Sequence, residues 1–237
     1  MNRLALVALA LVALAFVALP AAAGGGLLER LAAAAPDADP KVLALALQAR
    51  TCAMAQGGED SASRLAVIDY SRPSTQTRLW VFDLKRKALL FAEHVAHGRG
   101  SGENLAHAFS NRDGSHQSSL GLFRTAETYE GGNGYSMRMD GLEPGVNDAA
   151  RDRLIVMHGA PYVDPLAALK QGRLGRSFGC PAVRPAVARD LIDTLKQGQL
   201  LFAYYPDPDW LKHSRVLGCS GRTAANANSA AGPAPGA

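Results

Sequence analysis

Through the middle of the chain, hydrophobic and polar residues follow the short-period pattern of β-strands. The apolar runs are short, and clusters of Gly, Pro, Asn, Asp and Ser separate them. Runs of this kind are typical of half-buried or buried strands. We therefore expect a mainly β fold, with strands near residues 65–69, 79–84, 88–95, 120–125, 135–139, 154–158 and 199–205.

Three stretches interrupt this pattern. Asp39 followed by Pro40 is a helix-start signal, and residues 42–54 are rich in Ala, Leu and Gln, which predicts an N-terminal helical prelude. Residues 185–197 place Val, Leu and Ile on one side of a second helix. Residues 97–119 are rich in Gly, Ser, Asn and His and predict a long loop, and such a loop inside a compact domain usually carries function.

The two ends of the chain have compositions of their own. Residues 1–23 read as a secretory signal, because Arg3 is the only charge, an apolar run follows, and small residues offer a cleavage site. An uncleaved anchor is the alternative, but the run is shorter than the roughly 20 residues that span a membrane. We expect an exported protein without a stable membrane span after cleavage. After about residue 221 the chain is Ala, Asn, Gly, Ser and Pro, which predicts a disordered tail.

Length and charge restrict the remaining choices. The 237 residues, 48% of them hydrophobic, suffice for one domain of ordinary size. We expect the signal at 1–23, a helical extension at 24–61, the main domain at 62–208 and a C-terminal segment at 209–237. The net charge of +4 is mild, and the basic run at 85–87 lies between two expected strands. It reads as a solvated turn, so no nucleic-acid partner is expected.

The chain has three cysteines, and an exported protein is exposed to an oxidising compartment. An odd number leaves at least one thiol without a partner in the same chain. A bridge between Cys52 and Cys219 would join the two ends of the domain and leave Cys180 free. Three reduced cysteines are an equal alternative, and the sequence does not decide between them.

Cys180 and His158 are the residues that suggest chemistry. His158 ends an apolar strand and precedes Gly159, whereas Cys180 ends a glycine-rich loop just before a helix. An imidazole beside a thiol can take its proton and so activate it as a nucleophile. A structural thiol and a structural histidine are the alternative. If His94 and His97 share a strand, their spacing of three positions sends them to opposite faces, so no metal site is expected.

Several ordered motifs make the chain resemble the L,D-transpeptidase catalytic domain family (YkuD-like), and specifically its second, distinct branch of murein L,D-transpeptidases. The resemblance covers roughly residues 62–206. Its motifs are residues 67–74 (VIDYSRPS), 95–102 (VAHGRGSG), 109–111 (FSN), 118–121 (SSLG), 141–148 (GLEPGVND), 156–159 (VMHG), 172–176 (GRLGR) and 177–183 (SFGCPAV).

This resemblance implies a YkuD-like β-sandwich with a crossing helix and a cysteine acyltransferase without metal or organic cofactor. Its substrates would be peptidoglycan stem peptides, cleaved after the third residue with release of D-Ala. Cys180 would be the nucleophile, His158 the base, and the carbonyl of Gly159 would orient the imidazole. Amides of Gly179 and Cys180 would supply the oxyanion donors. Arg173, Arg176 and Ser177 line the same loop as candidates for binding a substrate carboxylate, and Tyr162 is a candidate wall of the peptide site.

The chain departs from the best-known branch of the family at two positions. Phe178 stands where that branch has His, and Ala182 stands where it has Arg or Asn. Arg184, Arg176 and Asn111 are candidates for the missing substrate contacts. The acceptor of the acyl group stays open: an amine of a neighbouring stem, water in a carboxypeptidase, or a lipoprotein lysine. A non-catalytic wall-binding module is the alternative from another class, and the oligomeric state is not indicated.

Overall fold

The computed structural model describes residues 25–56 and 62–219. The expected signal at 1–23 and the expected disordered tail after about residue 221 lie outside the described residues. The helices are α1 (Leu27–Ala34), α2 (Pro40–Ala55), α3 (Pro165–Gln171), α4 (Pro185–Leu195) and α5 (Pro208–His213). The strands are β1 (Arg64–Asp69), β2 (Leu79–Asp83), β3 (Ala88–Glu93), β4 (Gly121–Gly131), β5 (Gly134–Gly141), β6 (Val156–Gly159), β7 (Ala182–Val183) and β8 (Leu200–Tyr204).

All eight strands belong to one hydrogen-bonded sheet, in the order β3-β2-β1-β8-β4-β5-β6-β7. Most neighbours are antiparallel, but β1 pairs in parallel with β8 and β6 pairs in parallel with β7. The mainly β fold expected from the sequence is therefore confirmed. The parallel β6–β7 pair matters most for the site, because it brings residue 158 beside residue 182.

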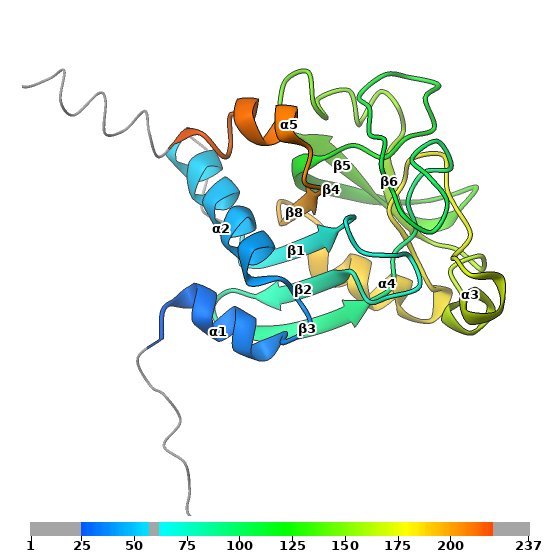
Figure 1. The fold of residues 1–237 in the computed structure, drawn as a ribbon, viewed down its shortest axis with the longest axis horizontal. Coiled ribbons are helices and arrows are strands. Elements are labelled where there is room, and N and C mark those ends of the chain that lie inside the picture. The colour runs from blue at the N-terminus through cyan, green and yellow to red at the C-terminus, as the bar shows by residue number, and fades with distance from the viewer. Residues whose placement is uncertain (1–24, 57–61, 220–237) are drawn as a thin grey trace, which may run out of the picture.

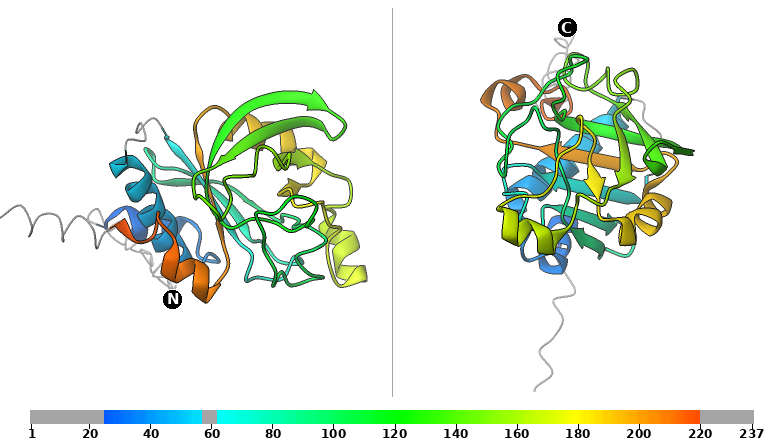
Figure 2. Two further views of the ribbon diagram at one scale, coloured as in Figure 1. Left: turned by 90° about the horizontal axis from the view of Figure 1, so that it is seen from above. Right: turned by 90° about the vertical axis from the view of Figure 1, so that its right-hand side faces the viewer.

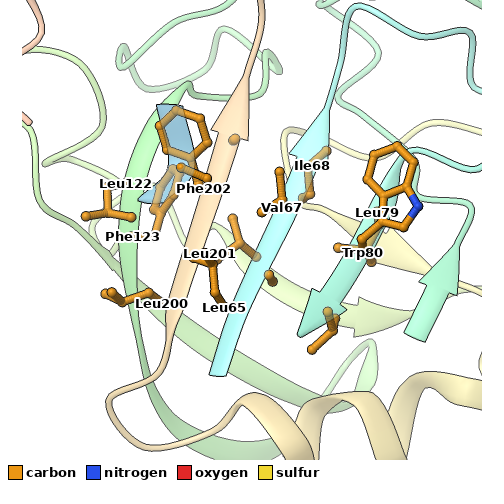
Figure 3. Close-up of a cluster of buried hydrophobic side chains, with 14 of the residues drawn as sticks. Leu65, Val67, Ile68, Leu79, Trp80, Leu122, Phe123, Leu200, Leu201 and Phe202 are labelled. Carbon is orange, nitrogen blue, oxygen red and sulfur yellow. The ribbon is translucent and has the colours of Figure 1, made fainter. Parts of the chain in front are cut away.

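The core lies around the central strands of this sheet. Every residue of β2 is buried, as is every residue of β1 after Arg64. Both α2 and α4 contact β1, so the strand is covered by helices as well as by its neighbours (Figure 1). Strands buried in this way read as continuous apolar runs. Figure 3 shows the cluster, which includes Leu65, Val67, Ile68, Leu79, Trp80, Leu122, Phe123, Leu200, Leu201 and Phe202.

The helical prelude forms as the sequence predicts. The Asp39 side chain accepts a hydrogen bond from the amide of Lys41 at 2.8 Å, and Pro40 occupies the first turn of α2. Cys52 near the end of α2 forms a disulfide with Cys219, with their Cα atoms 5.6 Å apart. This pairing resolves the choice that the sequence left open. Within the described ranges, no helix is both long enough and apolar enough to cross a bilayer.

Long loops collect at the end of the sheet away from α2. The segment between β3 and β4 and the segments on either side of α3 lie together there in both views of the ribbon (Figures 1 and 2). Backbone hydrogen bonds join them: Ala96 N donates to Ala182 O at 2.8 Å, and Ser177 N donates to His97 O at 3.0 Å. Cys180 lies in this group of loops, two residues before β7 begins at Ala182.

Candidate active site

Cys180 is the only cysteine of the described chain without a disulfide. Its side chain is nearly buried, with 9% of the residue exposed. The amide of Val156, at the start of β6, donates toward Sγ at 3.4 Å, and Sγ lies 3.6 Å from the carbonyl oxygen of Leu154. The thiol therefore lies against the beginning of β6, the strand that carries His158.

Hydrogen bonds and a glycine fix the backbone conformation of the loop before Cys180. Ser177 Oγ donates to Cys180 O at 2.7 Å and accepts from the Gly179 amide at 3.0 Å. Gly179 has a φ of +126°, and a Cβ there would lie 2.8 Å from the carbonyl oxygen of Gln117. Only glycine suits this backbone and this close approach. The hydroxyl of Ser177, expected to contact substrate, is buried and shapes the loop.

His158 lies at the end of β6, opposite Ala182 of β7. Its Nδ1 is 3.0 Å from the carbonyl oxygen of Gly159. A carbonyl can only accept, so Nδ1 carries the hydrogen and Nε2 of the neutral ring is an acceptor. Val156 and His158 are two positions apart and share one face of the strand, about 7 Å from each other along it. Cys180 Sγ therefore lies against the amide of the residue two positions before His158 on the same strand.

Burial moves both groups toward their neutral forms. It raises the pKa of the Cys180 thiol above its ordinary value, and it lowers the pKa of the His158 imidazole. The Val156 amide and the positive charge of Arg153 act in the opposite direction on Cys180 and favour the thiolate. Burial thus favours the neutral thiol and the neutral imidazole over a preformed ion pair.

Arg153 is a site residue that the sequence reasoning missed. Its guanidinium group is partly buried and donates to four neutral oxygens of the long loop. These are Ser110 O and Ser119 Oγ at 2.6 Å, Gln117 O at 2.7 Å and Ser115 Oγ at 3.2 Å. Nη2 lies 3.6 Å from the position of a Cβ on Gly179. Because no carboxylate accepts these bonds, the charge stays available to the neighbouring thiol.

A buried polar group supports the opposite side of the loop. Ser118 Oγ accepts from the Gly98 amide at 3.0 Å and donates to Gly179 O at 3.1 Å. His97 is buried, and its Nδ1 lies 2.7 Å from Nη2 of Arg78, which is itself fully buried. Burial first, and then the charge of Arg78, lowers the pKa of His97 to about 3. His97 is therefore neutral and structural.

The arginines expected to bind substrate already have acidic partners. Glu103 pairs with Arg173 Nε at 2.8 Å and with Arg176 Nη1 at 2.7 Å. Glu93 pairs with Arg184 at 2.7 Å. The fourth candidate, Asn111, donates to Asp148 Oδ1 at 2.6 Å and accepts from the amide of Ala149. The structure thus places Arg173 and Arg176 beside the loop but with their charges neutralised.

Two aromatic side chains border the site. Tyr162 stands edge-on to His158, with the ring centroids 6.5 Å apart, and packs against the backbone of Gly175. Phe178 is 62% exposed although it lies two positions before the buried Cys180. Tyr162 is therefore a direct neighbour of the imidazole, and its role in lining the peptide site stays a prediction.

The histidines weighed as metal ligands have separate partners. His94 Nε2 lies 3.1 Å from the carbonyl oxygen of Thr75, whereas His97 faces Arg78 and Gly102. Among the described residues, no three His, Cys, Asp or Glu side chains come together as a metal site would require.

Fold and site together are those of a mainly β domain with an unpaired cysteine beside a strand-end histidine. The family model of L,D-transpeptidase catalytic domains matches residues 34–204. The chain belongs to this family, as its sequence motifs indicate. No curated protein matches the chain.

Solved structures of related folds are similar to only part of the chain. L,D-transpeptidase 3 from Mycobacterium tuberculosis is 12% identical, with 60% of this chain and 61% of that chain covered and a TM-score of 0.38. An L,D-transpeptidase from Mycobacterium smegmatis is 15% identical, with 61% and 59% covered and a TM-score of 0.36. Bd1075 from Bdellovibrio bacteriovorus is 16% identical, with 69% and 56% covered and a TM-score of 0.39. The chain thus spans less than two thirds of the length of each.

Proposed function

We propose that this protein is an exported peptidoglycan L,D-transpeptidase that works through a thioacyl-enzyme on Cys180. The observation that carries the proposal is the position of Cys180 Sγ against the start of β6, with His158 on the same strand and its Nδ1 held by Gly159 O. Family membership supports the reaction type, and the apolar residues 1–23 support export to the periplasm or cell wall.

In the proposed reaction, Nε2 of His158 takes the thiol proton while Sγ attacks the carbonyl carbon of the third stem residue. The amide of Cys180 would donate to the developing oxyanion. The Gly179 amide, also expected as a donor, is engaged by Ser177 Oγ and would have to exchange that partner. Collapse of the intermediate breaks the peptide bond, and D-Ala leaves with the proton held by His158.

The thioacyl-enzyme is then resolved by a nucleophile. Attack by an amine of a neighbouring stem forms a 3→3 cross-link and regenerates the thiol, with His158 acting as base again. Water in the same position would give a tripeptide and make the protein an L,D-carboxypeptidase. A non-catalytic wall-binding module is disfavoured because binding alone has no use for a thiol placed beside an imidazole.

The test uses the mature protein, its Cys180→Ala variant and a disaccharide tetrapeptide with diaminopimelate at the third position. Wild type should release D-Ala and gain the mass of the acyl group, whereas Cys180→Ala should fold normally and show neither. The intact disulfide Cys52–Cys219 keeps those two sulfurs out of the reaction. A dimeric product indicates transfer and a tripeptide indicates hydrolysis. Turnover by Cys180→Ala, or none by folded wild type, would refute the proposal.

A further inference from the structure

The acidic partners of the expected arginines leave a question about which group receives a substrate carboxylate. Arg173, Arg176 and Arg184 form ion pairs, as described above. Arg153 uses its guanidinium group on the oxygens of the long loop. Three of these arginines therefore have their charge neutralised by a carboxylate, and the N–H donors of Arg153 are occupied by loop oxygens. A stem tetrapeptide nevertheless carries carboxylates close to the bond that is cleaved.

Arg99 differs from them in its surroundings. It is exposed, and among the described residues no carboxylate lies within ion-pairing distance of it. Its backbone is fixed against the loop of Cys180, because Arg99 N donates to Ser177 O at 2.8 Å. The preceding residue, Gly98, approaches so closely that a Cβ there would lie 2.9 Å from Gly179 Cα. Arg99 therefore borders the nucleophile loop directly.

The guanidinium group of Arg99 is oriented by two rings. Its Cζ lies 4.4 Å from the ring centroid of Phe178, and Nδ1 of His116 accepts from Nε at 3.2 Å and from Nη2 at 3.1 Å. His116 also packs on Phe178, with the centroids 4.7 Å apart. An arginine has five N–H donors, and within the described residues those of Nη1 have no hydrogen-bond partner. A flat cation on an aromatic surface with free donors is suited to a carboxylate.

We propose that Arg99, seated on Phe178, binds a carboxylate of the donor stem peptide and so sets donor specificity. This assignment rests on the proposed function. Phe178, which replaces the histidine of the better-known branch of the family, would then support the guanidinium group of Arg99. The carboxylate belongs either to the terminal D-Ala or to the side chain of diaminopimelate, and both lie near the bond that is cleaved.

Binding is measured in the Cys180→Ala background, where the ligand cannot be consumed. The disaccharide tetrapeptide is titrated by calorimetry into this protein and into the same protein with Arg99→Gln, Arg99→Lys or Arg189→Gln. Arg189 is the matched control because it also stacks on an aromatic ring, that of Tyr135 at 4.2 Å, and it pairs with Glu130 on the hairpin of β4 and β5. Thermal unfolding verifies that each variant is folded.

Arg99→Gln should weaken binding about tenfold, because it removes a charge-assisted bond. Arg99→Lys keeps the charge but loses the flat stack and should lie between wild type and Arg99→Gln. Arg189→Gln should bind as the parent does. Two further ligands, amidated at the D-Ala carboxylate or at the diaminopimelate side chain, identify the source. The ligand that is amidated at the carboxylate bound by Arg99 should bind the parent more weakly than the unmodified tetrapeptide does. Arg99→Gln should then cause no further loss of affinity for that ligand.

Three results would overturn the assignment. They are that Arg99→Gln binds the tetrapeptide as tightly as its Cys180→Ala parent, that its effect persists with both amidated ligands, or that the Cys180→Ala parent itself does not bind the tetrapeptide. Turnover by the protein with Cys180 intact is measured separately. An active enzyme whose binding ignores Arg99 refutes only this assignment, whereas absence of the acyl adduct refutes the proposed function.

Discussion

His97 provides a sharp test of how the loop beside Cys180 is held. Its side chain is 1% exposed, and Nδ1 faces the Arg78 guanidinium, which can only donate, so the imidazole must be neutral and accept. Nε2 then donates to Gly102 O at 3.2 Å. The neighbouring groups are the cations Arg78 and Arg176 and, edge-on at 6.4 Å, the ring of Tyr70. Protonation would place a second buried cation against Arg78.

The size of the effect follows from the pKa of His97, which burial and Arg78 lower from 6.5 to about 3. Because the folded-state pKa lies below the unfolded-state value, the stabilisation is complete above pH 6.5 and is lost as the pH falls toward 3. At 1.36 kcal/mol per pKa unit, the free energy of unfolding at about pH 4 should be about 3 kcal/mol lower than at neutral pH because of His97. A protein without this histidine should lack that part of the acid sensitivity.

The assay is urea unfolding at several pH values between about 7 and 4, followed by the fluorescence of the buried Trp80 and Trp210. Over this pH range, the free energy of unfolding of wild type should fall by about 3 kcal/mol more than that of His97→Gln. His213→Gln, which removes an exposed histidine of α5, should follow wild type. Parallel curves for wild type and His97→Gln would refute the reasoning. If His97→Gln does not fold, an NMR resonance of His97 in wild type that titrates near pH 6.5 gives the same refutation.

Two other substitutions probe the site and its frame. Arg153→Gln should raise the pKa of the Cys180 thiol and slow its alkylation by iodoacetamide at neutral pH, because a charge that favours the thiolate is lost. Arg153→Lys should restore part of the alkylation rate. An unchanged pH profile of alkylation would contradict the effect of Arg153 on the thiol. Replacing Cys52 and Cys219 together by serine should lower the free energy of unfolding by about 2–5 kcal/mol, because the bridge spans 167 positions. Wild type in reductant should show the same loss, and stability independent of the bridge would show that it does not constrain the chain.

Local patterns in the sequence were sufficient for most of the strands. The runs at 65–69, 79–84 and 199–205 correspond to β1, β2 and β8 within one or two residues. Asp39-Pro40 predicts the start of α2, and the same Asp-Pro pair precedes α3 at Asp164 and α5 at Asp207, two helices that are not among the elements expected from the sequence. In all three helices the aspartate caps the first turn. The Asp-Pro pair is therefore a helix-start signal for α3 and α5 as well as for α2.

Long-range partners were not predictable in the same way. β7 has two residues, too few for a periodic pattern, and its register with β6 depends on a parallel pairing. Arg173 and Arg176 looked free because their partner Glu103 lies about 70 positions earlier. Arg153 gave no signal, since its acceptors are mostly backbone and serine oxygens of a loop between residues 110 and 119. These contacts exist only once the loops are brought together by the sheet.

Burial that favours the neutral forms of Cys180 and His158 has a consequence for an enzyme of the proposed kind. The thiolate is the form of cysteine that is alkylated and oxidised, and exposure increases both reactions. A protein exported to a compartment where disulfides persist needs to keep its nucleophile reduced. Burial of Cys180 and its raised pKa limit the thiolate, while Arg153, the Val156 amide and Nε2 of His158 remain available to generate it when a carbonyl carbon arrives. Protection and reactivity are therefore compatible, because the charge forms during attack and not before it.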